Sequence, residues 1–247
     1  MFKRTLATAI VLLWCGALYA QDKPTIYRGV YIKAKAGMVQ KVEDGFKDHN
    51  KKFHKKKGLE VTTFQMMSGP KMGWYLRIMG GADWENFDKY TEPAGDAEHW
   101  AKYITPYIDE VPMQFAGQFY ARLLSDLSYN YERTSMSRVL TDDVRPGMGG
   151  KYYSILSKAK EAEEKTDGEV RYAVYTLADG GNVSQYSIIY AIDSWSDLNP
   201  RSTGLGKRIN EVHGEGTLSE MWKQFSEVVT KRTSEVRLRR PDLSTMK

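Results

Sequence analysis

The sequence repeats part of itself at an offset of 110 to 111 residues, and this repeat constrains the fold more than any other feature. The matched pairs are Arg28 and Arg138, Gly37 and Gly147, Met38 and Met148, Lys41 and Lys151, Lys55 and Lys165, Gly58 and Gly168, Tyr75 and Tyr186, Ile78 and Ile189, and Trp84 and Trp195. The order of the secondary-structure signals repeats as well, which is typical of a duplicated unit. We therefore expect two copies of one fold.

The first half, residues 26–131, shows the order β-α-β-β-α-β. Alternating apolar and polar residues over 29–35 predict a half-buried strand. Apolar residues near a spacing of 3.6 over 38–57 predict an amphipathic helix. Strands at 59–67 and 73–79 follow, joined by a turn that contains Gly and Pro. Broken helices over 82–124 and a strand near 125–131 complete the half.

The second half, residues 136–240, repeats this order. We expect a strand at 136–141, a helix to about residue 166, strands at 169–178 and 184–193, a helix at 218–231 and a strand at 234–239. Each half reads as a ferredoxin-like unit, whose sheet carries helices on one face only. The expected fold is therefore α+β, with two tandem ferredoxin-like repeats whose antiparallel sheets pack face to face as an α/β barrel.

The first twenty residues have the pattern of a secretory signal peptide. Lys3 and Arg4 precede an apolar run that ends at Cys15, and small residues follow up to Ala20. Cleavage after Ala20 would make the protein periplasmic or secreted, with no stable membrane anchor. It would also remove the single cysteine and lower the net charge from +5 to +3, which is too mild to predict nucleic-acid binding.

One stretch, residues 51–57, concentrates positive charge and ends at Gly58. Cations suit the negative end of the helix dipole and glycine suits the position after a helix, so the stretch predicts a helix C-terminus. Weak contact with an anionic surface is the alternative. His49 and His54 belong to this region, where we expect solvated or dipole-complementing roles.

The order of elements, with Trp84 and Trp195 just after the third strand of each half, resembles the dimeric α/β-barrel superfamily over residues 26–240. Members with this layout include antibiotic-biosynthesis-type monooxygenases, small haem-degrading oxygenases and tandem-repeat haem proteins of the chlorite dismutase type. The resemblance to the haem-degrading members implies an iron-ligating histidine in the helix after the third strand. His99 and His213 are the candidates, with haem as the cofactor that they would hold. No other cofactor and no metal site are expected, because no motif for them is present.

The strands offer candidate ligand-binding residues. Lys33 shares a strand face with Tyr31, and Tyr75 shares one with Arg77. If these faces point into the barrel, they present cations and aromatic rings to an amphipathic molecule. The full candidate set is Lys33, Tyr75, Arg77, Trp84, Tyr186, Tyr190 and Trp195. The alternative is that these residues fill a closed core or solvate an edge.

Three classes of function stay open. The first is an exported protein that binds a small amphipathic or aromatic molecule in the barrel. The second is an oxygenase-type enzyme, either haem-dependent or cofactor-free. The third is a structural module that uses the fold to form a homo-oligomer. No catalytic residue can be named, and the sequence identifies neither a substrate nor whether the two halves pack on each other or on a second chain.

Overall fold

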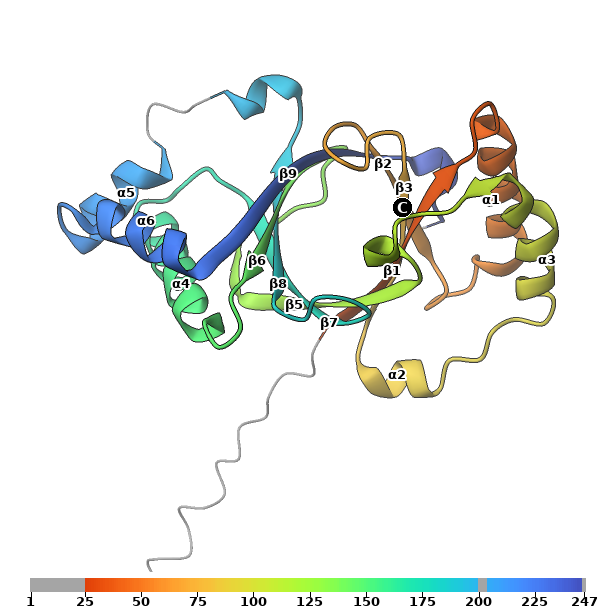
Figure 1. Cartoon of the computed structure of the whole chain (residues 1–247), viewed down its shortest axis with the longest axis horizontal. Coiled ribbons are helices and arrows are strands. Elements are labelled where there is room, and N and C mark those ends of the chain that lie inside the picture. The colour runs from red at the N-terminus through yellow and green to blue at the C-terminus, as the bar shows by residue number, and fades with distance from the viewer. Residues whose placement is uncertain (1–24, 200–203, 246–247) are drawn as a thin grey trace, which may run out of the picture.

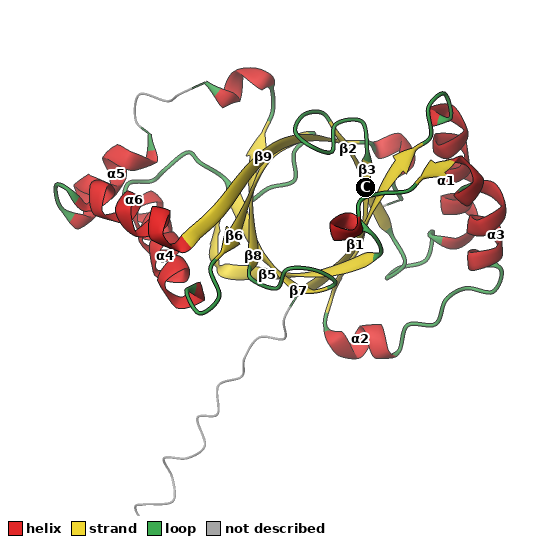
Figure 2. Cartoon of the chain, in the orientation of Figure 1, coloured by secondary structure: helices red, strands yellow, loops and turns green. Residues whose placement is uncertain are grey.

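The computed structural model describes residues 25–199 and 204–245 of the 247-residue chain. The predicted signal peptide, residues 1–20, lies outside this part. A ring of strands occupies the centre of the molecule, and a group of helices lies on each side of it (Figures 1 and 2). Among the described residues, no helix combines the length and the apolar character that crossing a membrane requires.

The elements follow the order expected from the sequence, with some short additions. The strands are β1 (Ile26–Ala34), β2 (Val61–Met66), β3 (Tyr75–Ala82), β4 (Ile108–Asp109), β5 (Gln118–Tyr129), β6 (Met136–Val144), β7 (Tyr172–Asp179), β8 (Gln185–Ile192) and β9 (Val229–Arg239). The α-helices are α1 (Val39–Phe53), α2 (Trp84–Asp88), α3 (Asp96–Tyr103), α4 (Gly149–Lys165), α5 (Leu205–His213) and α6 (Thr217–Val228). Short 3-10 turns are η1 (Thr105–Tyr107), η2 (Met113–Phe115), η3 (Trp195–Leu198) and η4 (Pro241–Leu243).

Eight of the strands close into an antiparallel barrel in the order β3-β2-β9-β6-β8-β7-β5-β1, and pairing of β1 with β3 completes the ring. The small strand β4 attaches to the end of β1. The first and second halves of the chain meet edge to edge, through β2 with β9 and through β5 with β7. The two separate facing sheets expected from the sequence are therefore one continuous sheet that encloses its own interior.

Both halves have the same strand order, β2-β3-β1-β5 and β7-β8-β6-β9. Several boundaries differ from the sequence prediction, among them those of β5 and α6. Strand β5 begins at Gln118, because residues 118–122 pair with β1 although a helical pattern was expected there. Helix α6 ends at Val228 and β9 follows at once, three residues before the predicted end of the helix.

Helices cover the outer face of the barrel and bury its apolar residues. In the first half, α1 places Val42 and Phe46 against Ile32 and Tyr75 of the sheet. In the second half, α4 places Tyr152 and Leu156 on the sheet. A further cluster, Ile155, Ala162, Ile209 and Met221, joins α4 to α5 and α6. Burial of these apolar surfaces is the main stabilising contribution to the fold.

The basic stretch at the end of α1 differs from the prediction. The helix ends at Phe53, with His54 as its C-cap residue, rather than near Gly58. Lys55, Lys56 and Lys57 are exposed as expected. In contrast, His49 and His54 are buried, with exposed fractions of 1% and 5%, because the chain after α1 and helix α3 cover them. The expectation that these histidines are solvated is therefore wrong, whereas the alternative, that they complement the helix dipole, stays a prediction.

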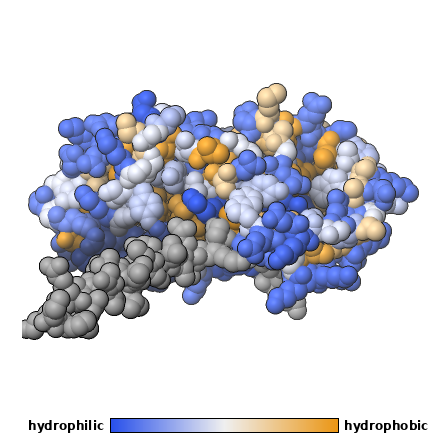
Figure 3. Space-filling view, turned by 90° about the horizontal axis from the view of Figure 1, so that it is seen from below, coloured by the Kyte–Doolittle hydropathy of each residue, from blue (hydrophilic) through white to orange (hydrophobic). Residues whose placement is uncertain are grey.

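The face of the molecule shown in Figure 3 is mostly hydrophilic, and its hydrophobic residues lie in small separate groups. Large apolar side chains that remain exposed include Trp84, Trp195 and Trp222.

Candidate functional site

The barrel encloses a cavity of about 890 Å³, which is within the size range of small-molecule binding sites. Successive side chains of a strand point to opposite faces, so alternate residues of the eight barrel strands line the cavity. On β1, β5, β6, β7, β8 and β9 these are odd-numbered residues, with Ser128 and Thr176 as exceptions, and on β2 and β3 they are even-numbered. Many of the outward-pointing apolar residues lie under the helices.

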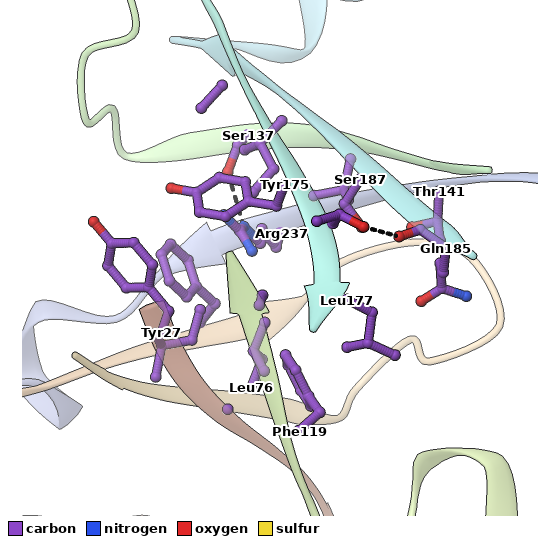
Figure 4. Close-up of a pocket in the computed structure, with 18 of the residues that line it drawn as sticks. Tyr27, Leu76, Phe119, Ser137, Thr141, Tyr175, Leu177, Gln185, Ser187 and Arg237 are labelled. Carbon is purple, nitrogen blue, oxygen red and sulfur yellow. Dashed lines mark hydrogen bonds between the residues drawn. The ribbon is translucent and has the colours of Figure 1, made fainter. Parts of the chain in front are cut away.

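Part of the cavity wall is apolar and aromatic. It consists of Tyr27, Phe64, Leu76, Ile78, Phe115, Phe119, Leu123, Val139, Tyr175, Leu177 and Ile189. Figure 4 shows Tyr27 and Tyr175 from β1 and β7 beside one another, and their rings meet edge to face at 5.6 Å. Such a wall can pack against the rings or the hydrocarbon part of a ligand.

A second part of the wall is polar. Ser137, Thr141, Gln185 and Ser187 face the cavity from β6 and β8 (Figure 4). At its edge, the carboxylate of Asp143 accepts a hydrogen bond of 2.9 Å from the side-chain amide of Gln185. Hydroxyl and amide groups beside apolar surface give a cavity two kinds of wall, which suits an amphipathic molecule.

Arg237 of β9 is a buried cation on this wall, with an exposed fraction of 5%. Its Nε donates a hydrogen bond of 3.0 Å to Oγ of Ser137, as Figure 4 shows. Its guanidinium carbon lies 4.1 Å from the centre of the Phe64 ring. Among the described residues, its side chain makes no other hydrogen bond and no ion pair. Two terminal nitrogens therefore remain as donors toward the cavity.

Lys71, from the loop between β2 and β3, also lines the cavity, where it lies beside the rings of Tyr31 and Phe115. Its Nζ lies 2.7 Å from Oε1 of Glu235, and both side chains are buried. The ammonium group also lies 5.0 Å from the Tyr31 ring centre and 4.7 Å from that of Phe115. Because Glu235 neutralises Lys71, the pair adds no net charge to the site.

Burial raises the pKa of the Tyr31 and Tyr175 hydroxyls above the ordinary tyrosine value. Both phenols therefore stay protonated near neutral pH and can donate a hydrogen bond to a ligand. They are poorly suited to act as bases at that pH.

The residues predicted from the third strand of the first half lie elsewhere. Tyr75 and Arg77 are on the outer face of β3, toward α1, and are buried there. The Tyr75 hydroxyl donates a hydrogen bond of 2.6 Å to Glu43. Nη2 of Arg77 donates one of 2.8 Å to Asn50. This placement differs from the expectation, because the apolar residues Leu76 and Ile78 take the cavity side.

The corresponding residues of the second half are also on the outer face. The Tyr186 ring packs 4.7 Å from that of Tyr152 on α4, and the Tyr190 ring packs 5.6 Å from that of Tyr172. Neither tyrosine is part of the cavity lining. The four outer-face residues thus share one environment, the interface between sheet and helices.

Lys33, Trp84 and Trp195 lie outside the cavity lining too. Lys33 forms a half-exposed ion pair of 2.6 Å with Asp109 of β4. Trp84 and Trp195 begin helical turns after β3 and β8, with exposed fractions of 41% and 51%. The structure therefore does not bring the predicted set together into one site, and a ligand role for these residues stays untested.

The two histidines predicted to ligate haem are held in the helical layers. His99 of α3 contacts His49 and Asp48 through its two ring nitrogens. Nε2 of His213 lies 3.0 Å from the carbonyl oxygen of Lys158 on α4. None of the four histidines lines the cavity. A haem inside the barrel therefore finds no histidine ligand in this arrangement.

Sequence reasoning missed Arg237, Lys71 and Glu235. A signal was present in β9, where Glu235, Arg237 and Arg239 alternate with Val236 and Leu238. An alternation of this kind shows that the two faces differ but not which face is inside. The apolar face of a strand usually packs in the hydrophobic core. Here that core lies between the barrel and the helices around it, so the polar face of β9 points into the barrel.

Comparisons with known proteins relate the chain to others through its fold alone. No family model matches the sequence, and no curated protein matches it. A protein from Lactobacillus acidophilus, proposed to be a monooxygenase, has 9% identity and a TM-score of 0.51, over 88% of this chain and 94% of the other. A protein from Fusobacterium nucleatum, also proposed to be a monooxygenase, has 10% identity and a TM-score of 0.53, over 88% and 92%.

Chlorite dismutase from Candidatus Nitrospira defluvii, solved in complex with imidazole, has 8% identity and a TM-score of 0.51. The match covers 90% of this chain and 93% of that one. These neighbours are dimeric α+β barrel proteins of the ferredoxin-like kind. The chain therefore shares the dimeric α+β barrel fold, and its sequence assigns it to no family within that fold.

Proposed function

We propose that the barrel binds a small amphipathic molecule, with its apolar or aromatic part against the ring-lined wall and an anionic group on Arg237. The observation that carries this proposal is a buried arginine with unused donors beside a cavity of about 890 Å³. A buried cation is unfavourable unless it is paired, and guanidinium donors match carboxylate, sulfonate or phosphate oxygens well. The Lys71–Glu235 pair is neutral, so Arg237 is an attractive point for such an anion, and Arg133, Lys231 and Arg239 add positive charge elsewhere along the lining.

Oxygenase chemistry on an aromatic substrate is the second candidate. It is favoured by neighbours of the same fold that are proposed to be monooxygenases. The enclosed cavity would keep bulk water from a reactive intermediate, and the protonated hydroxyls of Tyr31 and Tyr175 would orient the substrate. A haem-dependent version is supported by the likeness to chlorite dismutase, but His99 and His213 are not placed to serve a haem in the cavity.

Two further expectations stand as parts of this proposal, and a third competes with it. The matching strand orders of the two halves support an origin by tandem duplication of a ferredoxin-like unit. The pattern of residues 1–20 supports export with cleavage after Ala20. A homo-oligomer that uses the fold as a structural module is the competing function, and it needs no ligand in the cavity.

The first experiment is a fluorescence titration with two probes that share an aromatic body. These are N-phenyl-1-naphthylamine, which is neutral, and 1-anilinonaphthalene-8-sulfonate, which adds an anion. We expect saturable binding of both probes at one site. A Ser187→Trp variant fills the cavity from β8 and should lose most of the binding, whereas Ser154→Trp on the exposed face of α4 should keep it.

Circular dichroism of each variant checks that the fold is retained, because the anionic probe also binds loosened proteins. Binding that survives Ser187→Trp in a folded protein would place the probes outside the barrel and overturn the proposal. No binding together with concentration-dependent association in sedimentation would favour the structural module.

A further inference from the structure

A second cluster of reactive side chains lies outside the barrel, between α1 and α3. It consists of His49 and His54 at the end of α1 and Asp96 at the start of α3. All three are buried, and one ring nitrogen from each histidine and a carboxylate oxygen of Asp96 lie within 4.8 Å of one another. None of the three lines the barrel cavity, so the cluster is independent of the site proposed above.

The ring of His54 is oriented by the main chain. Its Nδ1 lies 2.8 Å from the carbonyl oxygen of Leu59. A carbonyl oxygen only accepts, so Nδ1 carries the hydrogen, and Nε2 of the neutral ring keeps its lone pair. This arrangement, with one ring nitrogen donating to a carbonyl, is the usual support for a histidine that ligates a metal.

His49 sits in a chain of three contacts. Its Nδ1 lies 3.2 Å from Nδ1 of His99, and Nε2 of His99 lies 2.9 Å from Asp48. Its own Nε2 lies 3.3 Å from Oδ1 of Asp96. Two neutral rings supply only two N–H groups for these three contacts, so one contact brings two lone pairs together.

Lys52 decides how the hydrogens are placed, because its ammonium group lies 3.0 Å from Nε2 of His99 and can only donate. Nε2 of His99 therefore accepts from Lys52, which also lies 2.8 Å from Asp48 and bridges the two. Nδ1 of His99 then donates to Nδ1 of His49, and Nε2 of His49 donates to Asp96. A metal ion would replace this last hydrogen, which would leave to water as a proton, and would face the lone pairs of His49, His54 and Asp96.

Asp96 makes no direct contact with a lysine or arginine. Among the described residues, no lysine or arginine nitrogen lies within 4.0 Å of its carboxylate, which lies 3.3 Å from Nε2 of His49. Burial raises the pKa of Asp96 and the charge of Glu92 adds to this, whereas the more distant charges of Arg28 and Arg77 lower it. Burial lowers the pKa of His49 to about 3 and that of His54 to about 4, so both rings are neutral near pH 7.

We propose that His49, His54 and Asp96 bind one divalent transition-metal ion of the zinc class. Neutral imidazoles and a carboxylate are suitable ligands for such an ion. Two ligands of a tetrahedral zinc ion lie roughly 3.4 Å apart, which agrees with the 3.3 Å between His49 and Asp96. A water molecule would take the fourth position, and the ion would tie the end of α1 to the start of α3.

The positive charges of two arginines oppose the ion. Arg77 lies near enough to lower the pKa of both histidines, although its guanidinium bonds Asn50 and packs on the Phe46 ring at 4.5 Å. Arg28 lowers the pKa of His54 as well. We therefore expect binding that is saturable but weaker than that of a site with four protein ligands.

The test is titration of the chelator-treated protein with Co²⁺, followed by absorption in the visible range. We expect one equivalent of Co²⁺ to give the intense bands of a four- or five-coordinate ion, and Zn²⁺ to displace it. Asp96→Asn, which keeps the shape of the side chain, and His54→Gln should each weaken binding at least tenfold. His213→Gln, in the other helical layer, should bind as the unchanged protein does.

If these variants do not fold, the Co²⁺ titration of the unchanged protein is sufficient to test the proposal. A weak octahedral spectrum, or no saturation at one equivalent, would overturn the proposal. Equal loss of binding in His213→Gln would overturn it too, because the ion would then lie elsewhere. A rise in the melting temperature with Zn²⁺ that Asp96→Asn abolishes would support the tie between the helices.

Discussion

Arg237 and Ser137 face each other across the pair β9 and β6, and Nε of Arg237 donates a hydrogen bond of 3.0 Å to Oγ of Ser137 on the cavity side. On the outer side of the same two strands, Nε of Arg138 donates a bond of 3.2 Å to Oγ of Ser234. The two arginines thus have matching serine partners and differ in what the guanidinium faces. They form a matched pair for testing charge recognition in the cavity.

Arg237→Gln is expected to weaken binding of 1-anilinonaphthalene-8-sulfonate by about tenfold or more, equivalent to about 1.4 kcal/mol. Binding of the neutral N-phenyl-1-naphthylamine should change much less, because only the anion uses the guanidinium. Arg138→Gln should leave both affinities unchanged. Fluorescence titrations of the three proteins make the comparison, and an equal loss for the two probes in Arg237→Gln would contradict an anion-binding role.

Lys71→Met is expected to destabilise the fold by about 3–5 kcal/mol, because it leaves the buried carboxylate of Glu235 without its cation. The double variant Lys71→Met with Glu235→Leu should recover most of this loss. Lys165→Met removes an exposed pair with Glu161 and should change stability by less than about 1 kcal/mol. Urea denaturation measures all four proteins, and a small effect of Lys71→Met would show that water reaches Glu235.

Glu43 is expected to make part of the stability depend on pH. Hydrogen bonds from Arg240 hold the pKa of the Glu43 carboxyl below its ordinary value, and burial opposes them. The stabilisation is thus fully present above the unfolded pKa of about 4.3. It is lost as the pH falls through the lower, folded pKa.

The measurement for Glu43 is the free energy of unfolding of the unchanged protein and of Glu43→Gln between pH 7 and pH 3. The difference between them should be largest at neutral pH and should shrink as the pH falls below about 4. Glu211→Gln, at an exposed position on α5, serves as the control. A difference that is independent of pH would show that the bond to Arg240 does not depend on the charge of Glu43.

Much of the architecture was predictable because it rests on local patterns. The repeat at 110 to 111 residues and the order of elements predicted the layout of both halves. The pairing of β5 with β7 and of β2 with β9 was not predictable, because long-range partners leave no periodic signal. Only these pairings turn two expected sheets into one closed barrel.

The candidate site was less predictable than the fold, because alternation gives two faces without saying which is inside. Arg77 and Tyr75 were expected in the cavity, whereas the neighbouring Leu76 and Ile78 line it. The cluster of His49, His54 and Asp96 has no recognisable spacing, since Asp96 comes from a different helix. A site of this kind appears only when the packing of α1 on α3 is known.

The remaining prediction concerns haem. We expect hemin to give the same absorption between 350 and 650 nm with His99→Ala, with His213→Ala and with the unchanged protein. The reason is that both rings are engaged in the helical layers and neither borders the cavity. Any band would then come from hemin held by groups other than these two histidines. Loss of a saturable Soret band in either histidine variant, with the fold retained, would instead establish that histidine as the iron ligand and favour a haem-dependent oxygenase.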